Sequence, residues 1–242
     1  MAGKLTPMKI TSMLARVLGL AVLLCGVCVA TAVPGAFTAT YRVSRDGQAL
    51  GVATVTLRPS DHGSWVYTKD VSGTGGLAAL LDASVHESSQ LRWRGDVPEA
   101  LSYDYQLNAA IKHKQRHLQV NWTTGQVTVD EGKHPTTYSA QPGMVERNTL
   151  PLAIGLALRD DKQEILLPVA VRQKVEDQHF KVTGTESVEV PAGSFQALRV
   201  ERTDADRGFS AWYVPKRYPL PIKLAQHDGG DMVMVLVSFK DS

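Results

Sequence analysis

Two histidines four residues apart, His113 and His117 in the segment IKHKQRH, are the best candidates for metal chemistry in this sequence. On a helix, two residues with this spacing lie close enough to bind one zinc ion, but on a strand they are about 13 Å apart. The residues that follow, Leu118, Val120 and Trp122, alternate with polar residues as in a strand. We therefore expect neither a metal ion nor a cofactor.

The same segment holds the densest group of basic residues in the chain, Lys112, Lys114 and Arg116. The simplest interpretation is a strand end kept in water by its charges, which also protect a sheet edge from aggregation. The functional alternative is a site that binds an anion, either the phosphate headgroup of a lipid or an envelope polysaccharide.

Acid–base chemistry has weak support. The sequence contains no Gly-x-Ser-x-Gly elbow, phosphate-binding glycine loop or His-Glu-x-x-His motif. His86 adjoins Glu87, but neighbouring strand residues point to opposite faces of a sheet. Asp104 and Glu87 are the candidates for an enzyme acting on a cell-wall or polysaccharide substrate. We expect no catalytic residue and favour a non-enzymatic protein.

Short strands must position these side chains. Apolar and polar residues alternate with the period of a half-buried strand in most of the sequence, and turn residues such as Asp46-Gly47 and Pro191-Ala192-Gly193 separate the segments. Pro191-Ala192-Gly193 predicts a three-residue hairpin loop in which Gly193 adopts the left-handed conformation. The expected strands include residues 37–44, 50–58, 65–71, 85–94, 100–107, 114–122, 126–130, 164–171, 209–214, 221–227 and 232–239.

Two segments interrupt this pattern. TLPLAIGLALRD, residues 149–160, predicts a helix that is apolar on nearly all sides and therefore buried, with Thr149 as its N-cap. GTGGLAALLDA, residues 73–83, predicts a glycine hinge and a short helical flap that carries Leu77, Leu80 and Leu81. We expect a mainly β protein of about a dozen antiparallel strands, forming a curved sheet or partly open β-barrel around the buried helix.

The segment MVMVLVSF, residues 232–239, is apolar on both faces and predicts a central strand that is covered on both sides. A sharper interpretation is that Met232, Met234 and Leu236, together with Tyr105, line a cavity for a hydrophobic ligand.

The first 32 residues predict a secretory signal peptide. Three basic residues precede an uncharged apolar run at 17–30, and Ala30-Thr31-Ala32 supplies small residues for cleavage. The run is shorter than the ~20 residues of a membrane-spanning helix, so we expect no transmembrane span after cleavage. Met8 is an equally good start site to Met1. Residues 33–242 are then expected to form one periplasmic domain without cysteine, because Cys25 and Cys28 both lie in the signal.

Cleavage also changes the charge. The chain has 26 basic and 24 acidic residues, and loss of the three basic residues of the signal leaves a net charge of −1. A chain with this charge has no global attraction for nucleic acid, so we exclude that partner.

The order of several segments resembles the domain-of-unknown-function 3108 family of exported bacterial proteins. These segments are FTATYRVSRDGQALGVATVTL, LSYDYQL, KHKQRHLQVNW, VEVPAGSFQALRVER, AWYVPKRYPLPIKL and VLVSF. The resemblance covers nearly all of residues 33–242 and implies a periplasmic, β-rich protein with no established activity. It supplies no catalytic residues. Glu146-Arg147-Asn148 stands where such proteins tend to carry an acidic residue before the helix.

Three functions remain open at this point. The first is binding of a hydrophobic or amphipathic envelope molecule, a lipid or glycan, inside the curved sheet, gated by the flap at residues 73–83. The second is assembly of envelope proteins through a sheet edge or the flap. The third is the enzyme acting on cell-wall or polysaccharide substrate.

Overall fold

The computed structural model describes residues 1–3, 33–132, 134–205, 208–226 and 231–242. Contacts divide the chain into two units, residues 1–30 and 31–242, and the second unit holds every helix and strand described below. The expected signal peptide lies almost entirely outside the described residues. No helix in the described ranges is long and apolar enough to cross a membrane.

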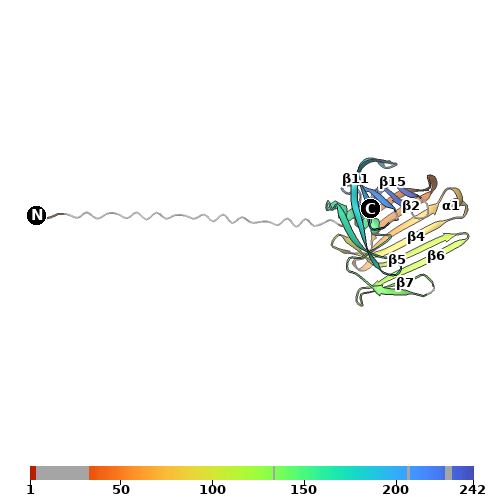
Figure 1. Cartoon of the computed structure of the whole chain (residues 1–242), viewed down its shortest axis with the longest axis horizontal. Helices are drawn as coiled ribbons and strands as arrows, with labels where there is room; N and C mark the ends of the chain where they lie inside the picture. Colours follow the sequence, from red (N-terminus) through yellow and green to blue (C-terminus); the bar gives the residue numbers. More distant parts are fainter. Residues whose placement is uncertain (4–32, 133, 206–207, 227–230) are drawn as a thin grey trace. The chain divides into compact units, whose positions relative to one another are not determined.

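The described residues form fifteen strands, two α-helices and one 3-10 turn (Figure 1). The first half contains β1 (Phe37–Arg45), β2 (Gln48–Pro59), η1 (Asp61–Gly63), β3 (Trp65–Gly73), α1 (Gly76–Leu80), β4 (Ser84–Arg94), β5 (Val97–Ala109), β6 (Lys112–Asn121), β7 (Gln126–Asp130) and β8 (Thr136–Ser139). The second half contains β9 (Val145–Glu146), α2 (Leu150–Arg159), β10 (Glu164–Ala170), β11 (Val175–Val190), β12 (Gly193–Arg202), β13 (Phe209–Tyr213), β14 (Lys223–Gln226) and β15 (Met232–Asp241).

All of these strands belong to one sheet, in the order β8-β7-β6-β5-β4-β3-β2-β1-β15-β14-β13-β12-β11-β10-β9. Neighbours pair antiparallel, except that β9 runs parallel to β10. The first and last strands pair with each other, with Phe37 opposite Asp241, so the two ends of the folded unit meet in the middle of the sheet.

The sheet curls until its second half reaches β5. The backbone amide of Ala100 in β5 donates to the carbonyl of Met144, just before β9, at 2.9 Å. The Tyr138 hydroxyl of β8 donates to the carbonyl of Val171, just after β10, at 2.5 Å. Since β8 and β9 are not paired in the sheet, the fold is a curled open sheet, which is one of the two forms, curved sheet or partly open β-barrel, expected from the sequence.

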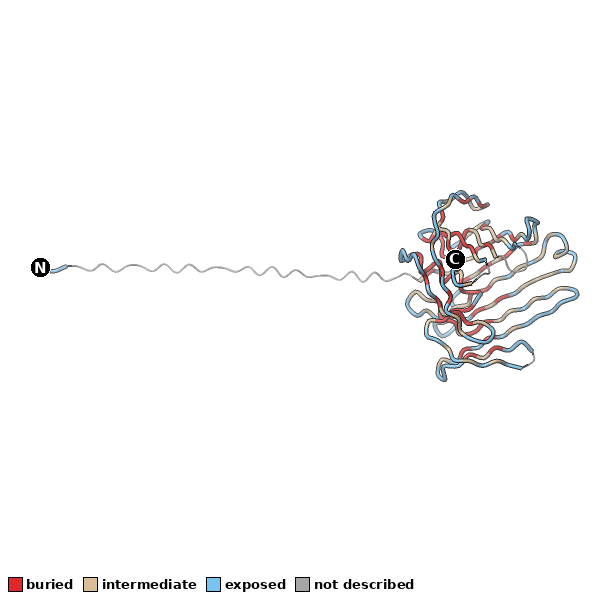
Figure 2. The backbone as a smooth tube through the Cα atoms, viewed as in Figure 1, coloured by how far each residue is buried: buried red, intermediate tan, exposed pale blue. Residues whose placement is uncertain are grey.

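Helix α2 lies inside this curl. Leu152 and Leu156 pack into one cluster of buried side chains, whereas Ile154 and Leu158 pack into a second one. Every residue from Leu152 to Leu158 is buried, so the prediction of a helix that is apolar on nearly all sides and buried is confirmed. Along β5 and β6 the residues near the connecting turn are exposed or half-buried, and the buried stretches lie farther along each strand (Figure 2).

Three local predictions need correction. Val190 pairs directly with Gly193, so the β11–β12 loop has two residues rather than three, although Gly193 has a positive φ, 134°, as expected. Thr149 stands at the N-cap position of α2 as predicted, but its hydroxyl donates to the Glu146 carbonyl and makes no capping hydrogen bond to the helix. Strand β15 is central but incompletely covered, because Met232 and Val237 are each 37% exposed.

Candidate functional site

The curl contains a cavity of about 760 Å³ that is open to solvent on one side. Its apolar wall comes from both halves of the sheet and from α2, and includes Leu118, Val129, Leu150, Val169, Phe180 and Phe209. Its charged lining is mainly basic: Arg116, Arg147, Arg172, Lys174 and Arg202 face it, with Glu176 as the acidic residue. The site therefore combines an apolar wall with several polar and cationic groups.

Two of the arginines share one carboxylate. Glu131 accepts hydrogen bonds from Nε of Arg116 at 2.6 Å and from Nε of Arg172 at 2.8 Å. Partial desolvation would raise the pKa of Glu131, but the hydrogen bonds from Arg172 and Arg116 lower it below its ordinary value. One carboxylate between two guanidinium groups leaves a net positive charge at this side of the cavity.

Arg202 has its own partner. It forms two hydrogen bonds of 2.9 Å with the carboxylate of Asp204, and its Nη2 lies 3.8 Å from Glu176. The Arg202 hydrogen bonds lower the pKa of Asp204 to about 2. Arg202 is thus largely neutralised by groups of the protein itself.

Arg147 differs from these arginines because no carboxylate within the described part of the chain forms an ion pair with it. It lies between β9 and α2, it is exposed, and it lines the cavity next to Leu150 and Pro151. Its positive charge helps to lower the pKa of the nearby buried Glu87. A guanidinium group in this position has its donors free for an anion.

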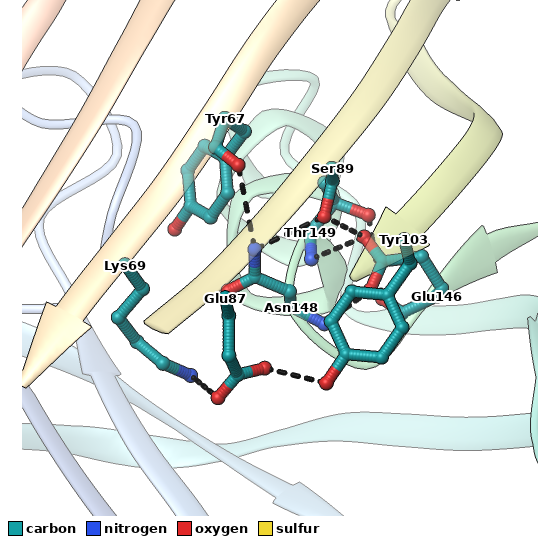
Figure 3. A network of polar contacts seen from close by, with 8 residues as sticks. All are labelled: Tyr67, Lys69, Glu87, Ser89, Tyr103, Glu146, Asn148 and Thr149. Carbon is teal, nitrogen blue, oxygen red and sulfur yellow. Dashed lines mark hydrogen bonds and ion pairs between the residues drawn. The ribbon is translucent and has the colours of Figure 1, made fainter. Parts of the chain in front are cut away.

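A buried polar network fixes the segment that carries Arg147 (Figure 3). The Glu146 carboxylate accepts hydrogen bonds from the backbone amides of Asn148 and Thr149, at 2.7 and 3.0 Å, and from the hydroxyl of Ser89 in β4 at 2.7 Å. Burial raises the pKa of Glu146. The network joins the start of α2 to β4, which holds Arg147 and Leu150 at the cavity.

A second buried carboxylate belongs to Glu87. Its oxygens accept from Nζ of Lys69 and from the hydroxyl of Tyr103, each at 2.8 Å (Figure 3). Burial would raise the pKa of Glu87, but the charge and hydrogen bond of Lys69 lower it. Tyr103 also lines the cavity, so its hydrogen bond to Glu87 holds a residue of the cavity wall in place.

The residues predicted to bind a ligand fall into three places. Met232 and Arg116 line the cavity. Leu236 is fully buried in the core, and Met234 and Tyr105 are half-buried against core clusters. Lys112 and Lys114 are exposed at the start of β6, near the β5–β6 turn.

The predicted flap contains α1. Glycines at its base allow close packing, since a Cβ on Gly75 would lie 2.5 Å from the Ala49 carbonyl. Leu80 is exposed and Leu81 is half-buried, and neither lines the large cavity. Ala78 instead lines a separate cavity of about 230 Å³ beside β2. The side chain of Leu77 lies outside the described parts.

The acid–base candidates are not brought together. Glu87 lies opposite Tyr105 and Asp104 opposite Ser88, so alternation along β4 places the two carboxylates on opposite faces of the sheet. Asp104 pairs with His117 at 2.7 Å on the exposed face. Within the described residues no group of three potential ligands is placed to hold a metal ion.

Sequence reasoning missed most of the basic lining: Arg147, Arg172, Lys174 and Arg202. They lie in three segments, each with only one or two basic residues, so a search for dense charge selects residues 112–117 instead. The only available signal was the run Glu146-Arg147-Asn148 directly before an apolar helix.

The fold and this site define a β-barrel-like protein made of one curled, mainly antiparallel sheet. The chain belongs to the family described as "Protein of unknown function (DUF3108)", whose sequence profile matches residues 37–237. The family resemblance stated from the sequence is therefore confirmed.

Comparisons with other proteins add two similar solved structures. One is a β-barrel-like protein of domain of unknown function DUF1849 from Brucella abortus, 11% identical, with a TM-score of 0.49, covering 87% of this chain and 99% of that one. The other, from Parabacteroides distasonis and provisionally described as a lipoprotein, is 10% identical, with a TM-score of 0.34, covering 86% of this chain and 96% of that one. None of the curated proteins compared with the chain matches it.

Proposed function

We propose that this protein is a non-enzymatic, periplasmic binding protein for an anionic amphipathic molecule of the cell envelope. The observation that carries this proposal is the combination, in one cavity of about 760 Å³, of an apolar wall with the guanidinium of Arg147, which has no ion-pair partner among the residues that the structure describes. Ligand cavities of a few hundred cubic ångströms, apolar with a few convergent polar groups, are the usual form of small-molecule sites. The apolar wall would bind an acyl or alkyl chain, and the guanidinium would bind its acidic headgroup.

The arrangement of charge favours an anionic headgroup over a neutral one. Arg116 and Arg172 share the Glu131 carboxylate, and Arg202 pairs with Asp204. Arg147 has no such partner within the described ranges and stands beside the buried apolar residue Leu150. An anion at this point would make charge-assisted hydrogen bonds, the stronger class of hydrogen bond.

Titration calorimetry with two ligands that share an alkyl chain tests the proposal. Dodecyl phosphate is expected to bind, and dodecyl maltoside, which has no charge, is expected to bind at least about tenfold more weakly because it lacks a charge-assisted hydrogen bond. Arg147→Gln should remove this difference. Arg42→Gln is the matched control, because Arg42 is exposed in β1 between the buried residues Tyr41 and Val43 and does not line the cavity.

Failure of both ligands to bind would refute the cavity as a site for amphiphiles. Equal binding of both ligands, unchanged in Arg147→Gln, would refute the anionic headgroup. Native mass spectrometry of the protein purified from its own periplasm then identifies the natural ligand, which we expect as a stoichiometric acidic lipid or acidic glycolipid.

A further inference from the structure

Two large apolar side chains stand in water at neighbouring turns. Leu80, at the end of α1, is 79% exposed, and Ile111, in the β5–β6 turn, is 84% exposed. A hydrogen bond of 3.0 Å from the Ala110 amide to the Leu81 carbonyl ties the two turns together. Leu80 and Ile111 together form the apolar tip. Figure 1 shows α1 and the β5–β6 turn at the same end of the strands.

Basic side chains adjoin the apolar tip. Lys112 and Lys114 are exposed and have no ion-pair partner among the residues that the structure describes. Asp82 is the exposed acidic residue between α1 and β4. Apolar side chains that protrude beside lysines are the combination that enters the interface of a membrane carrying anionic lipid.

The register of the sheet places the apolar tip on the same rim as several residues that line the cavity. Met232, which lines the cavity, is paired with Arg45 at the end of β1. From there, paired strand ends continue along the rim to the β5–β6 turn: Arg45 with Gln48, Gly51 with Gly73, Ser72 with Ser84, Ser84 with Asn108, and Ala109 with Lys112. The cavity residues Arg172 and Lys174 lie in the β10–β11 turn, and Gly208 in the β12–β13 loop.

We propose that this rim docks on the surface of an anionic lipid bilayer, with Leu80 and Ile111 inserted among the headgroups and Lys112 and Lys114 against anionic lipid. The exposure of both apolar residues, and of the two lysines beside them, supports this occupant. Docking in this way turns the cavity mouth toward the membrane. The consequence, that the ligand passes between bilayer and cavity without crossing water, rests on the function proposed above.

Vesicle co-sedimentation tests the docking. The wild-type protein should bind vesicles of phosphatidylcholine and phosphatidylglycerol more tightly than vesicles of phosphatidylcholine alone. Leu80→Ser/Ile111→Ser should weaken binding to the anionic vesicles by at least roughly tenfold, because each inserted side chain contributes its transfer from water. Lys112→Gln/Lys114→Gln should weaken it by roughly fivefold per lysine, and high salt should have the same effect.

A matched control has the same number of exposed apolar residues replaced elsewhere. Leu166 in β10 is 57% exposed and Val237 in β15 is 37% exposed, and neither lies at the rim. Leu166→Ser/Val237→Ser should leave vesicle binding unchanged. Circular dichroism should show the same sheet content for all of these variants.

Three outcomes would overturn the docking. The first is that the wild-type protein does not bind vesicles, and the second is that Leu80→Ser/Ile111→Ser binds them as tightly as the wild type. The third is that light scattering shows a wild-type dimer, and that Leu80→Ser/Ile111→Ser is monomeric while its vesicle binding is unchanged. The last result would make a second copy of the chain the occupant. Dodecyl phosphate binding without vesicles should be unchanged in the tip variant, so that failure of the cavity and failure of the docking give different results.

Discussion

Two ion pairs, Glu87 with Lys69 and Asp204 with Arg202, make the stability of this protein depend on pH. Glu87 is buried and depends on Lys69, whereas Asp204 depends on Arg202 close to the surface. In both cases the partner lowers the pKa of the carboxyl group. Each pair therefore contributes stability above the ordinary pKa of the acid and loses that contribution as the pH falls through the lowered pKa.

We predict that Lys69→Met destabilises the protein by about 3 kcal/mol at neutral pH, because it leaves the buried Glu87 carboxylate without its cation. Without Lys69, burial raises the pKa of Glu87. The loss should therefore be largest at neutral and higher pH and should shrink as the pH falls and Glu87 binds a proton. Urea unfolding at several pH values measures this. Lys69→Met/Glu87→Gln should recover most of the stability, and a loss independent of pH would contradict the explanation.

Asp204→Asn should cost about 1 kcal/mol, since the partly exposed pair with Arg202 is screened by water. The pKa of Asp204 is about 2, so this cost should be constant above about pH 4 and disappear as the pH approaches 2. The measurement is the urea midpoint at pH 6 and at pH 2. Asp177→Asn, in an exposed position of β11, should change neither midpoint.

At the scale of elements, α2 packs inside the curled sheet closely because it has a glycine, Gly155, where another part of the chain crosses it. A Cβ on Gly155 would lie 2.1 Å from the carbonyl oxygen of Pro219, so the chain after β13 can only approach the helix at a glycine. Leu150 of the helix lines the cavity, and the Glu146 carboxylate binds the Thr149 amide at the start of the helix. Helix position and cavity shape are therefore linked.

Gly155→Ala should destabilise the protein by about 3 kcal/mol, although alanine favours a helix by about 1 kcal/mol over glycine. The added methyl group meets backbone that cannot move without moving α2. Thermal unfolding measures the loss. Gly184→Ala in β11 is the control, because a Cβ there meets nothing within 4 Å, and its unfolding temperature should be unchanged or slightly higher.

At the scale of the whole folded unit, the pairing of β1 with β15 makes the middle of the sheet the place where chain ends meet. These strands have a paired neighbour on each side, whereas β8 forms one end of the sheet. Core side chains from β1, including Phe37, Ala39 and Tyr41, pack in the same cluster as Leu152 of α2. The centre of the sheet is thus tied to the helix, whereas no residue of β8 belongs to the clusters that contain α2.

Hydrogen exchange should follow this order. We predict that amides of β1 and β15 exchange only through global unfolding, and that amides of β8 exchange several orders of magnitude faster through local opening. Mass spectrometry of deuterated peptides measures both. Equal protection of β8 and β1 would show that the curled sheet is closed in solution.

The sequence by itself determined the local structure and the faces of the strands. Phe37, Ala39, Tyr41 and Val43 alternate with polar residues, and all four are buried as a period of two requires. The apolar run at residues 150–159 is a buried helix for a similarly local reason, since a helix without a polar face must be covered.

The tertiary structure alone decided which faces meet. Alternation gives the buried face of each strand but not the curl that brings β5 to β9, so the meeting of Arg116, Arg147, Arg172 and Arg202 at one cavity has no signature in their separate segments. The burial of Glu87 and Glu146 was likewise decided by the tertiary structure. A strand pattern does not reveal that a carboxylate will find Lys69, or two backbone amides and Ser89, because those partners are supplied by the curl and by the start of α2.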